Sequence, residues 1–322
     1  MTDTNLDSWL DLFHKQGIHP KQIAILQTID VGYNSTVYLL SLDGTKYAVK
    51  MYAERFNGTD VCLHERSQTL KARTSIPDAV PHVYFYSTHT DNGFHREILV
   101  MERVFGVPLT HDVFDDRVFD ELVTVLKRLH RTEARTGPAL DERVRLVHCR
   151  EVLLQFLQDD AVLASERVAN HFDALQRYYL EREEIFRRPR TIIHGDLWWD
   201  NILVDDGRIR LIDWLESSEQ EYCRDLAQFK IGVLNEVLDV AASQRFFEKI
   251  VNAYREEFED KTIFERIRYY LPTLFLEEAF YIPFTFFPWE IKYREDAEAF
   301  RRRFVDYYER SESFFKHEQE PS

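Results

Sequence analysis

One short segment carries three polar side chains whose types and spacing suit phosphoryl transfer. Asp196 lies in a His-Gly-Asp sequence, Asn201 follows after four intervening residues, and Asp213 lies twelve residues beyond Asn201. Phosphoryl transfer depends mainly on positioning, metal ions and fixed cations, because its charge is spread over phosphate oxygens. Asp196 is therefore the candidate to accept or orient the proton of an acceptor hydroxyl, acting as a modest base with an ordinary carboxylate pKa. Asn201 and Asp213 offer the oxygen ligands that magnesium prefers.

A β-hairpin is predicted to hold these groups together. Residues 201–204 and 208–212 are apolar-rich runs on either side of Asp205-Asp206-Gly207, which is a turn sequence. Asn201 would then enter the first strand, and Asp213 would follow the second. The alternative is that these polar residues only cap a turn and end a strand, since Asp and Asn are common in turns.

A second motif, upstream, favours the chemical interpretation. Residues 29–51 read as strand, loop, strand, turn and strand, and Lys50 lies in the third strand within Ala-Val-Lys. Kinases carry a phosphate-covering loop, a third-strand Lys, an Asp with an Asn, and a metal-binding Asp in this order. Lys50 would hold the nucleotide phosphates, although a strand Lys can also extend to solvent. Glu65 is its expected ion-pair partner, and Glu54 is the competitor.

At these residues the chain resembles the protein-kinase-like superfamily, and within it the aminoglycoside phosphotransferase and choline kinase family. The resemblance rests on His-Gly-Asp-Leu-x-x-x-Asn at 194–201, Ile-Asp-Trp at 212–214 and Asp-Leu-Ala at 225–227. It implies a two-lobed α+β protein-kinase-like fold, with a small antiparallel-sheet lobe at 1–105 and a larger, mainly helical lobe at 106–322. The larger lobe would contain the catalytic hairpin and the acceptor site.

The resemblance also implies the cofactors, ATP or GTP with Mg²⁺, and two backbone segments that contact the nucleotide. The loop before the second strand would cover the phosphates, and the connector after the fifth strand would meet the base. These segments consist of Gly32, Tyr33, Asn34 and Ser35, and of Met101, Glu102, Arg103 and Val104.

Departures from protein kinases favour a small-molecule acceptor. Trp198 stands where protein kinases carry a Lys, and no Ala-Pro-Glu sequence follows Asp213. The expected activity is therefore transfer of a nucleotide γ-phosphate to a hydroxyl of a small molecule. A catalytically silent nucleotide-binding regulator and, less favoured, a protein kinase are the alternatives. Packing is the preferred role of Trp198 and Trp199, with ligand stacking as the alternative.

Two neighbours of the motif are predicted to serve structure. His194 is expected to be a packed, hydrogen-bonded support for the catalytic loop, because Asp196 already fills the role of base. Asp225, ahead of Leu-Ala-Gln-Phe, is suited to a helix N-cap.

Charge and aromatic content give a weak indication of the acceptor. Residues 1–105 hold 10 Lys and Arg against 12 Asp and Glu, a net charge of −2, so the remainder carries −13 of the total of −15. This acidity disfavours nucleic-acid binding and would suit an amine-bearing acceptor. An aromatic and acidic run could bind such a cation, or it could simply close the helical core. Its candidate acceptor residues are Glu277, Glu278, Trp289 and Glu290.

Composition and hydrophobic periodicity predict the cellular location and the secondary structure. The chain of 322 residues is 44% hydrophobic, has no apolar run of membrane-spanning length and holds three scattered cysteines, so a cytoplasmic protein with reduced thiols is expected. The pattern predicts a five-stranded, mainly antiparallel lobe with a leading helix at 6–13 and a principal helix at 60–73. Further helices are predicted at 118–129, 147–163, 168–186, 226–254, 263–281 and 297–315.

Overall fold

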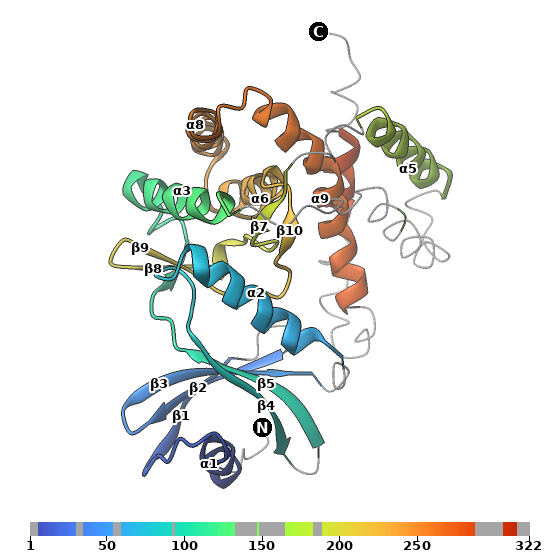
Figure 1. Ribbon diagram of the computed structural model, residues 1–322. Helices are drawn as coiled ribbons and strands as arrows, with labels where there is room; N and C mark the ends of the chain where they lie inside the picture. Colours follow the sequence, from blue (N-terminus) through green and yellow to red (C-terminus); the bar gives the residue numbers. More distant parts are fainter. Residues whose placement is uncertain are drawn as a thin grey trace. The chain divides into compact units, whose positions relative to one another are not determined.

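A five-stranded antiparallel sheet forms the first part of the chain, with strand order β1-β2-β3-β5-β4 (Figure 1). In this computed structural model the strands are β1 (Ile23–Ile29), β2 (Ser35–Leu42), β3 (Thr45–Tyr52), β4 (Val83–Asp91) and β5 (Phe94–Glu102). The predicted sheet is thereby confirmed. The structure describes residues 6–29, 35–53, 59–91, 94–132, 147, 165–182, 189–286 and 305–313.

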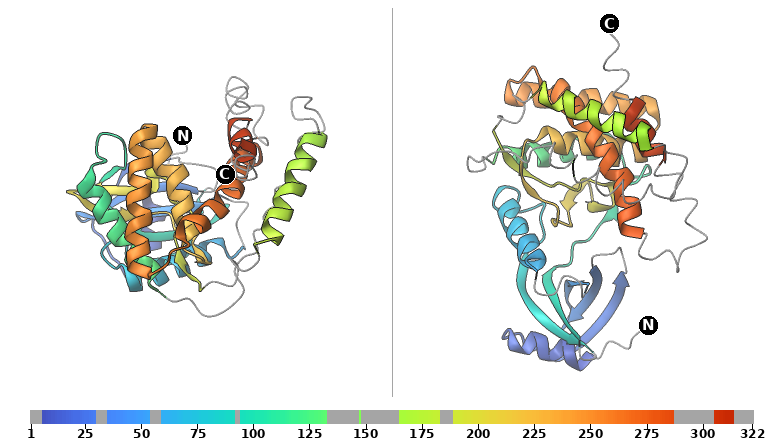
Figure 2. Two further views of the ribbon diagram at one scale, coloured as in Figure 1. Left: turned by 90° about the horizontal axis from the view of Figure 1, so that it is seen from above. Right: turned by 90° about the vertical axis from the view of Figure 1, so that its right-hand side faces the viewer.

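Two helices cover opposite faces of this sheet, as Figures 1 and 2 show. Helix α1 (Leu6–Lys15) packs Trp9 and Phe13 into a core with Val49 and Met51 of β3. Helix α2 (Val61–Ser75) lies on the other face. Because successive strand residues point to opposite faces, Lys50 faces α2 while its two neighbours face α1. This alternation, rather than any local motif, directs the Lys50 side chain.

The predicted β-hairpin is present. Strands β8 (Ile202–Asp205) and β9 (Arg208–Leu211) pair antiparallel, and the short β6 (Val107–Pro108) adds to β8. Asp206 and Gly207 at the turn both have positive φ, of 48° and 75°, as a tight two-residue hairpin turn requires. Asn201 differs slightly from its prediction, because it ends a 3₁₀ turn (Trp199–Asn201) and β8 begins one residue later.

The chain folds as two compact units: residues 1–132 with 194–218, and residues 133–193 with 219–322. The first unit thus includes the hairpin together with helix α3 (Asp116–His130). Leu211 N–H donates to Ala79 O, and Arg128 forms a bidentate ion pair with Asp78, so the segment after α2 ties the hairpin and α3 to the sheet. The functional lobes predicted at 1–105 and 106–322 stay a prediction.

The second unit is mainly helical, as predicted, but it also contains two short paired strands. These strands are β7 (Thr191–Ile193) and β10 (Ser218–Gln220). Its helices are α5 (Ser165–Leu180), α6 (Cys223–Phe229), a π-helical turn η5 (Lys230–Leu234), α7 (Asn235–Val237), α8 (Val240–Phe258) and α9 (Ile263–Phe286), and residues 305–313 are also helical. Residues 148–163 of the helix predicted at 147–163 lie outside the described residues.

The prediction of one continuous helix over 226–254 is wrong. Leu238 adopts an extended conformation, with φ −121° and ψ 156°, and a new helix begins two residues later at Val240. The Asp239 side chain accepts a hydrogen bond from Ala242 N–H at 2.8 Å and caps α8. An Asp cap satisfies a backbone donor only where the chain enters a helix, so the break is built into the sequence at Asp239.

The described helices include none with both the length and the apolar character that a membrane crossing requires.

Candidate active site

Lys50 and Glu65 form a buried ion pair between β3 and α2. Lys50 Nζ lies 3.1 Å from Glu65 Oε1 and 2.9 Å from Oε2, and the two residues are only 4% and 1% exposed. The expected partner is therefore in contact with Lys50. The competitor Glu54 lies outside the described residues.

Lys50 also contacts Asp213, which follows the β8–β9 hairpin. Its Nζ lies 2.7 Å from Asp213 Oδ1, although the two residues are 163 positions apart. Asp213 has a φ of 61°, in the left-handed region that Asp tolerates better than most residues. Its side chain is 41% exposed, so one side of the carboxylate meets solvent while the other meets the ammonium.

The Lys50 ammonium and the Asp213 carboxylate stabilise each other's charged form. Burial alone would lower the pKa of Lys50, but the carboxylates of Glu65 and Asp213 outweigh it and raise that pKa. Burial would likewise raise the pKa of Asp213, and the nearby Lys50 ammonium instead lowers it. For Glu65, burial dominates and raises the pKa, against the opposing effects of Lys50 and Tyr52. Lys50 and Asp213 are thus held in their charged forms.

Asn201 connects the Asp196 carboxylate to the backbone that precedes Asp213. Its Nδ2 donates to Asp196 Oδ2 at 2.8 Å and to the Asp196 backbone oxygen at 3.0 Å. Ile212 N–H donates to the Asn201 backbone oxygen at 3.0 Å, which places Asn201 opposite the neighbour of Asp213. Since the amide nitrogen is committed to Asp196, the Asn201 side-chain oxygen is the atom available as a ligand.

Asp196 differs from the ordinary carboxylate that the sequence suggested. Its pKa is raised to about 7, mainly by burial and further by the charges of Asp213, Glu216 and Asp200. The hydrogen bond from Asn201 opposes this rise. The prediction of an ordinary pKa is therefore wrong, because it ignored first the burial of Asp196 and then the carboxylates that the fold gathers around it. A carboxylate with this pKa accepts a proton more readily than a solvated one.

His194 uses both ring nitrogens within the loop. Its Nδ1 accepts from Asp196 N–H at 3.3 Å, so the proton is on Nε2, which donates to Ile212 O at 3.0 Å. The ring is fully buried and lies 4.6 Å, between centroids, from the ring of Trp214. These contacts join the residues beside Asp196 to the strand end that precedes Asp213.

Gly195 occupies a position that excludes any side chain. Its φ is 80°, and a Cβ there would lie 2.2 Å from Glu216 O. We expect Gly195→Ala to lower the free energy of unfolding by about 3 kcal/mol, from backbone strain and the clash. Gly44→Ala is the matched control, because Gly44 has a φ of 87° with no atom within 4 Å of the added Cβ. Urea unfolding of both variants measures the difference; equal losses would contradict the close approach.

The described residues among the other predicted nucleotide contacts lie at the ends of strands β2 and β5 or directly after β5. Ser35 begins β2 and is buried, whereas Gly32, Tyr33 and Asn34 lie outside the described residues. In the connector, Met101 and Glu102 end β5, and Arg103 and Val104 follow in irregular structure.

Several predictions on the second unit are modified by the structure. Asp225 does not cap a helix, because α6 begins at Cys223 with Tyr222 as its N-cap, and Asp225 lies within its first turn. Glu277 forms an ion pair with Arg224, at 2.6 Å, which compensates its charge inside the protein. Glu278 is half-buried, and Trp289 and Glu290 lie outside the described residues.

Three aromatic residues near these groups are also described by the structure: Trp198, Trp199 and Tyr52. Trp198 and Trp199 are both half-buried. Tyr52, which sequence reasoning missed, donates a hydrogen bond to Glu65. The signal for Tyr52 was its position two residues after Lys50, on the same face of β3.

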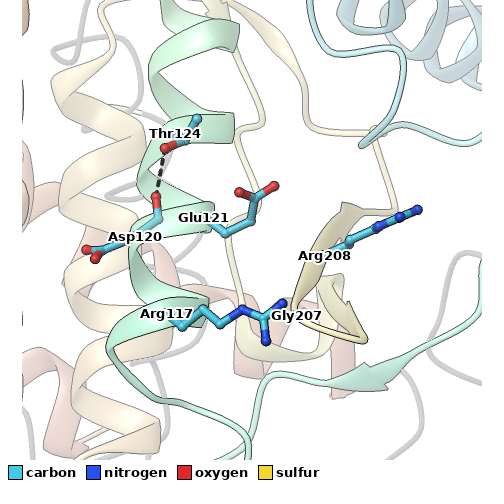
Figure 3. A pocket seen from close by; sticks show the side chains of 6 residues that line it. All are labelled: Arg117, Asp120, Glu121, Thr124, Gly207 and Arg208. Atoms are coloured by element: carbon cyan, nitrogen blue, oxygen red, sulfur yellow. Dashed lines mark hydrogen bonds between the residues drawn. The ribbon is translucent and has the colours of Figure 1, made fainter.

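A surface cavity of about 600 Å³ lies elsewhere in the first unit. Figure 3 shows that α3 and the hairpin turn line it, with two arginines and two carboxylates among the six lining residues. Its lining includes none of Lys50, Glu65, Asp196, Asn201 and Asp213, which together form the Lys50–Asp213 group. We therefore assign the candidate site to the Lys50–Asp213 group; the cavity residues are Arg117, Asp120, Glu121, Thr124, Gly207 and Arg208.

Solved structures with similar folds include known and presumed kinases. A thermostable mutant of the aminoglycoside phosphotransferase APH(4)-Ia is 16% identical, with a TM-score of 0.67 over 96% of this chain and 99% of the other. Choline kinase from Cryptosporidium parvum is 13% identical, with a TM-score of 0.65 over 97% of each chain. A putative aminoglycoside phosphotransferase from Ralstonia eutropha is 13% identical, with a TM-score of 0.64 over 97% of this chain and 96% of the other. The α+β protein-kinase-like fold is thereby confirmed.

The sequence itself gives the family. No protein of curated function matches the chain significantly. The family model of the phosphotransferase enzyme family matches residues 25–264, a range that includes Lys50, Glu65, Asp196, Asn201 and Asp213. This chain therefore belongs to the phosphotransferase enzyme family.

Proposed function

We propose that this protein is a cytoplasmic kinase that transfers the γ-phosphate of ATP or GTP to a hydroxyl group of a small molecule. The observation that carries the proposal is the junction of Lys50 with Glu65 and Asp213, next to the bonded pair of Asp196 and Asn201. A fixed cation, a base and two oxygen ligands are the groups that phosphoryl transfer requires. A mutant of the structurally similar aminoglycoside phosphotransferase APH(4)-Ia was solved in a ternary complex with AMP-PNP and hygromycin B. This similarity supports a nucleotide and a small-molecule acceptor for the present protein.

The residues at the end of the hairpin are suited to magnesium. Asp213 offers a charged carboxylate. Asn201 offers its side-chain amide oxygen, because only its amide nitrogen is used in the hydrogen bonds to Asp196. Hard oxygen donors of this kind are the ligands that Mg²⁺ takes beside phosphates. When bound, the ion would neutralise charge on the phosphates. Lys50 would hold the phosphates from the other side, and Asp196 would orient the acceptor hydroxyl and accept its proton.

The charge around Asp196 favours an amine-bearing acceptor. Asp200 and Glu216 both raise the pKa of Asp196 by their negative charge, so an acceptor that reaches Asp196 enters a negative region. A positively charged acceptor is stabilised by that potential. Glu277 contributes less than expected, because Arg224 already compensates its charge.

The two alternative functions fit the site less well. A silent nucleotide-binding regulator needs neither a carboxylate with a raised pKa at position 196 nor its hydrogen bond to Asn201, so these two features favour a kinase. A protein kinase needs a surface for a peptide, and the sequence has no Ala-Pro-Glu segment after Asp213.

An acceptor panel tests the proposal. We expect purified protein with Mg²⁺ and ATP or GTP to consume nucleotide faster when a hydroxyl-bearing amine is added, among aminoglycosides, choline, sugars and amino acids. Because Asp200 and Glu216 provide the negative potential, the kcat/KM for a cationic acceptor should fall as salt rises. Nucleotide binding without stimulation by any acceptor would favour the regulator, and phosphorylation of peptides alone would favour a protein kinase.

A further inference from the structure

Tyr52 contacts both members of the Lys50–Glu65 ion pair. Its hydroxyl donates to Glu65 Oε2, and its ring centroid lies 5.6 Å from Lys50 Nζ. Tyr52 follows Lys50 by two residues in β3, so both side chains face α2, where Tyr52 is fully buried. The three side chains form a closed cluster in which each touches the other two.

The Glu65 carboxylate requires a hydrogen-bond donor in addition to Lys50. The ammonium of Lys50 is shared between Glu65 and Asp213, and the proposed function adds nucleotide phosphates as a third partner. When Lys50 turns toward phosphate, a carboxylate that is 1% exposed would depend on its other donor. Burial raises the pKa of Tyr52, so its hydroxyl keeps its proton and remains a donor.

We propose that Tyr52 is a positioning residue for nucleotide binding, because its hydroxyl fixes the Glu65 carboxylate and thereby holds Lys50 in one orientation. This inference rests on the proposed function and deepens it. Tyr52 does not touch the nucleotide itself; it acts through Glu65. Its ring, beside the ammonium, adds a favourable cation–π contact that the corresponding Phe would retain.

The first test removes only the hydroxyl. We expect Tyr52→Phe to weaken binding of the Mg²⁺–nucleotide complex about tenfold, as the loss of one hydrogen bond to a charged group allows. The rate at saturating nucleotide should change much less, since Asp196 and the hairpin are unaltered. The matched control is Tyr47→Phe, on the same strand but in the core facing α1. Calorimetry should show unchanged nucleotide affinity for the control.

A double-mutant cycle separates positioning from a purely structural role. If Tyr52 acts through Glu65, then Tyr52→Phe should have little further effect on nucleotide affinity in a Glu65→Gln background. Additive losses would overturn the inference, as would an unchanged affinity in Tyr52→Phe alone. A Tyr52→Phe protein that does not fold would also overturn it, because the hydroxyl would then be a requirement of the fold.

The same measurements distinguish this inference from the proposed function. Failure of the wild-type protein to bind ATP or GTP with Mg²⁺ would remove the proposed function and this inference with it. Binding by the wild type with equal affinity in Tyr52→Phe would remove the inference alone. Binding with a tenfold loss, absent from Tyr47→Phe, would support both.

Discussion

Asp196→Asn is expected to lower the rate of acceptor phosphorylation by about 10²- to 10⁴-fold, which is the usual contribution of a general base. An amide has the shape of the carboxylate but cannot take up the proton of the acceptor hydroxyl. Its oxygen can still accept the hydrogen bond from Asn201, so the loop should keep its conformation. Nucleotide affinity should stay within a few fold of the wild type, because the role proposed for Asp196 is toward the acceptor and not the nucleotide. Single-turnover assays and nucleotide titration together measure the two effects.

The control for this variant is Asp200→Asn. Asp200 is exposed, lies four residues after Asp196, and raises the pKa of Asp196 by its charge. Removal of that charge should leave the rate at saturating acceptor within a few fold of the wild type, while the KM for a cationic acceptor rises. Normal turnover in Asp196→Asn would show that another group accepts the proton, and equal losses in the two variants would assign the effect to local charge.

Asp213→Ala is expected to abolish the magnesium dependence of nucleotide binding. Loss of a charged ligand should weaken binding in the presence of Mg²⁺ by about 100-fold, or about 2.7 kcal/mol. Asn201→Ala should weaken binding less, because its amide oxygen is neutral, but it should also slow turnover, since Asp196 loses its hydrogen-bonded clamp. The Lys50–Glu65 pair survives in both variants, so their folded structures should persist.

Calorimetric titration of nucleotide with and without Mg²⁺ measures these effects. Asp205→Ala is the control, because Asp205 is an exposed carboxylate at the turn of the same hairpin. It should bind nucleotide with the wild-type dependence on metal. A metal dependence that persists in Asp213→Ala would rule out Asp213 as the principal ligand.

Local sequence signals predicted much of this protein because the features concerned are local in origin. The hairpin around Asp206 and Gly207 follows from turn chemistry, and the sheet strands follow from apolar alternation. Helices α2, α3 and α9 begin within about three residues of their predicted starts, an ordinary error for helix ends. The family was also readable in sequence, since its motifs lie in short segments with fixed spacing.

Prediction from helix periodicity failed at residues 226–254, where a short interruption of the helix does not change the pattern of apolar residues. Residues 226–254 keep their hydrophobic character through the π-helical turn and the extended Leu238, so periodicity alone did not reveal the break. The cap at Asp239 was the available signal, and it was a single residue against a strong pattern.

The sequence by itself determined which candidate groups this protein has for chemistry: a strand Lys, an Asp within His-Gly-Asp, an Asn and a second Asp, in the order found in phosphotransferases. Only the tertiary structure decided how they interact. Lys50 meets Asp213 across 163 positions, Tyr52 bonds to Glu65, and Asp196 gains a pKa of about 7. These properties depend on burial and on charges that approach through folding, and electrostatic energy depends on distance and surroundings rather than on sequence separation.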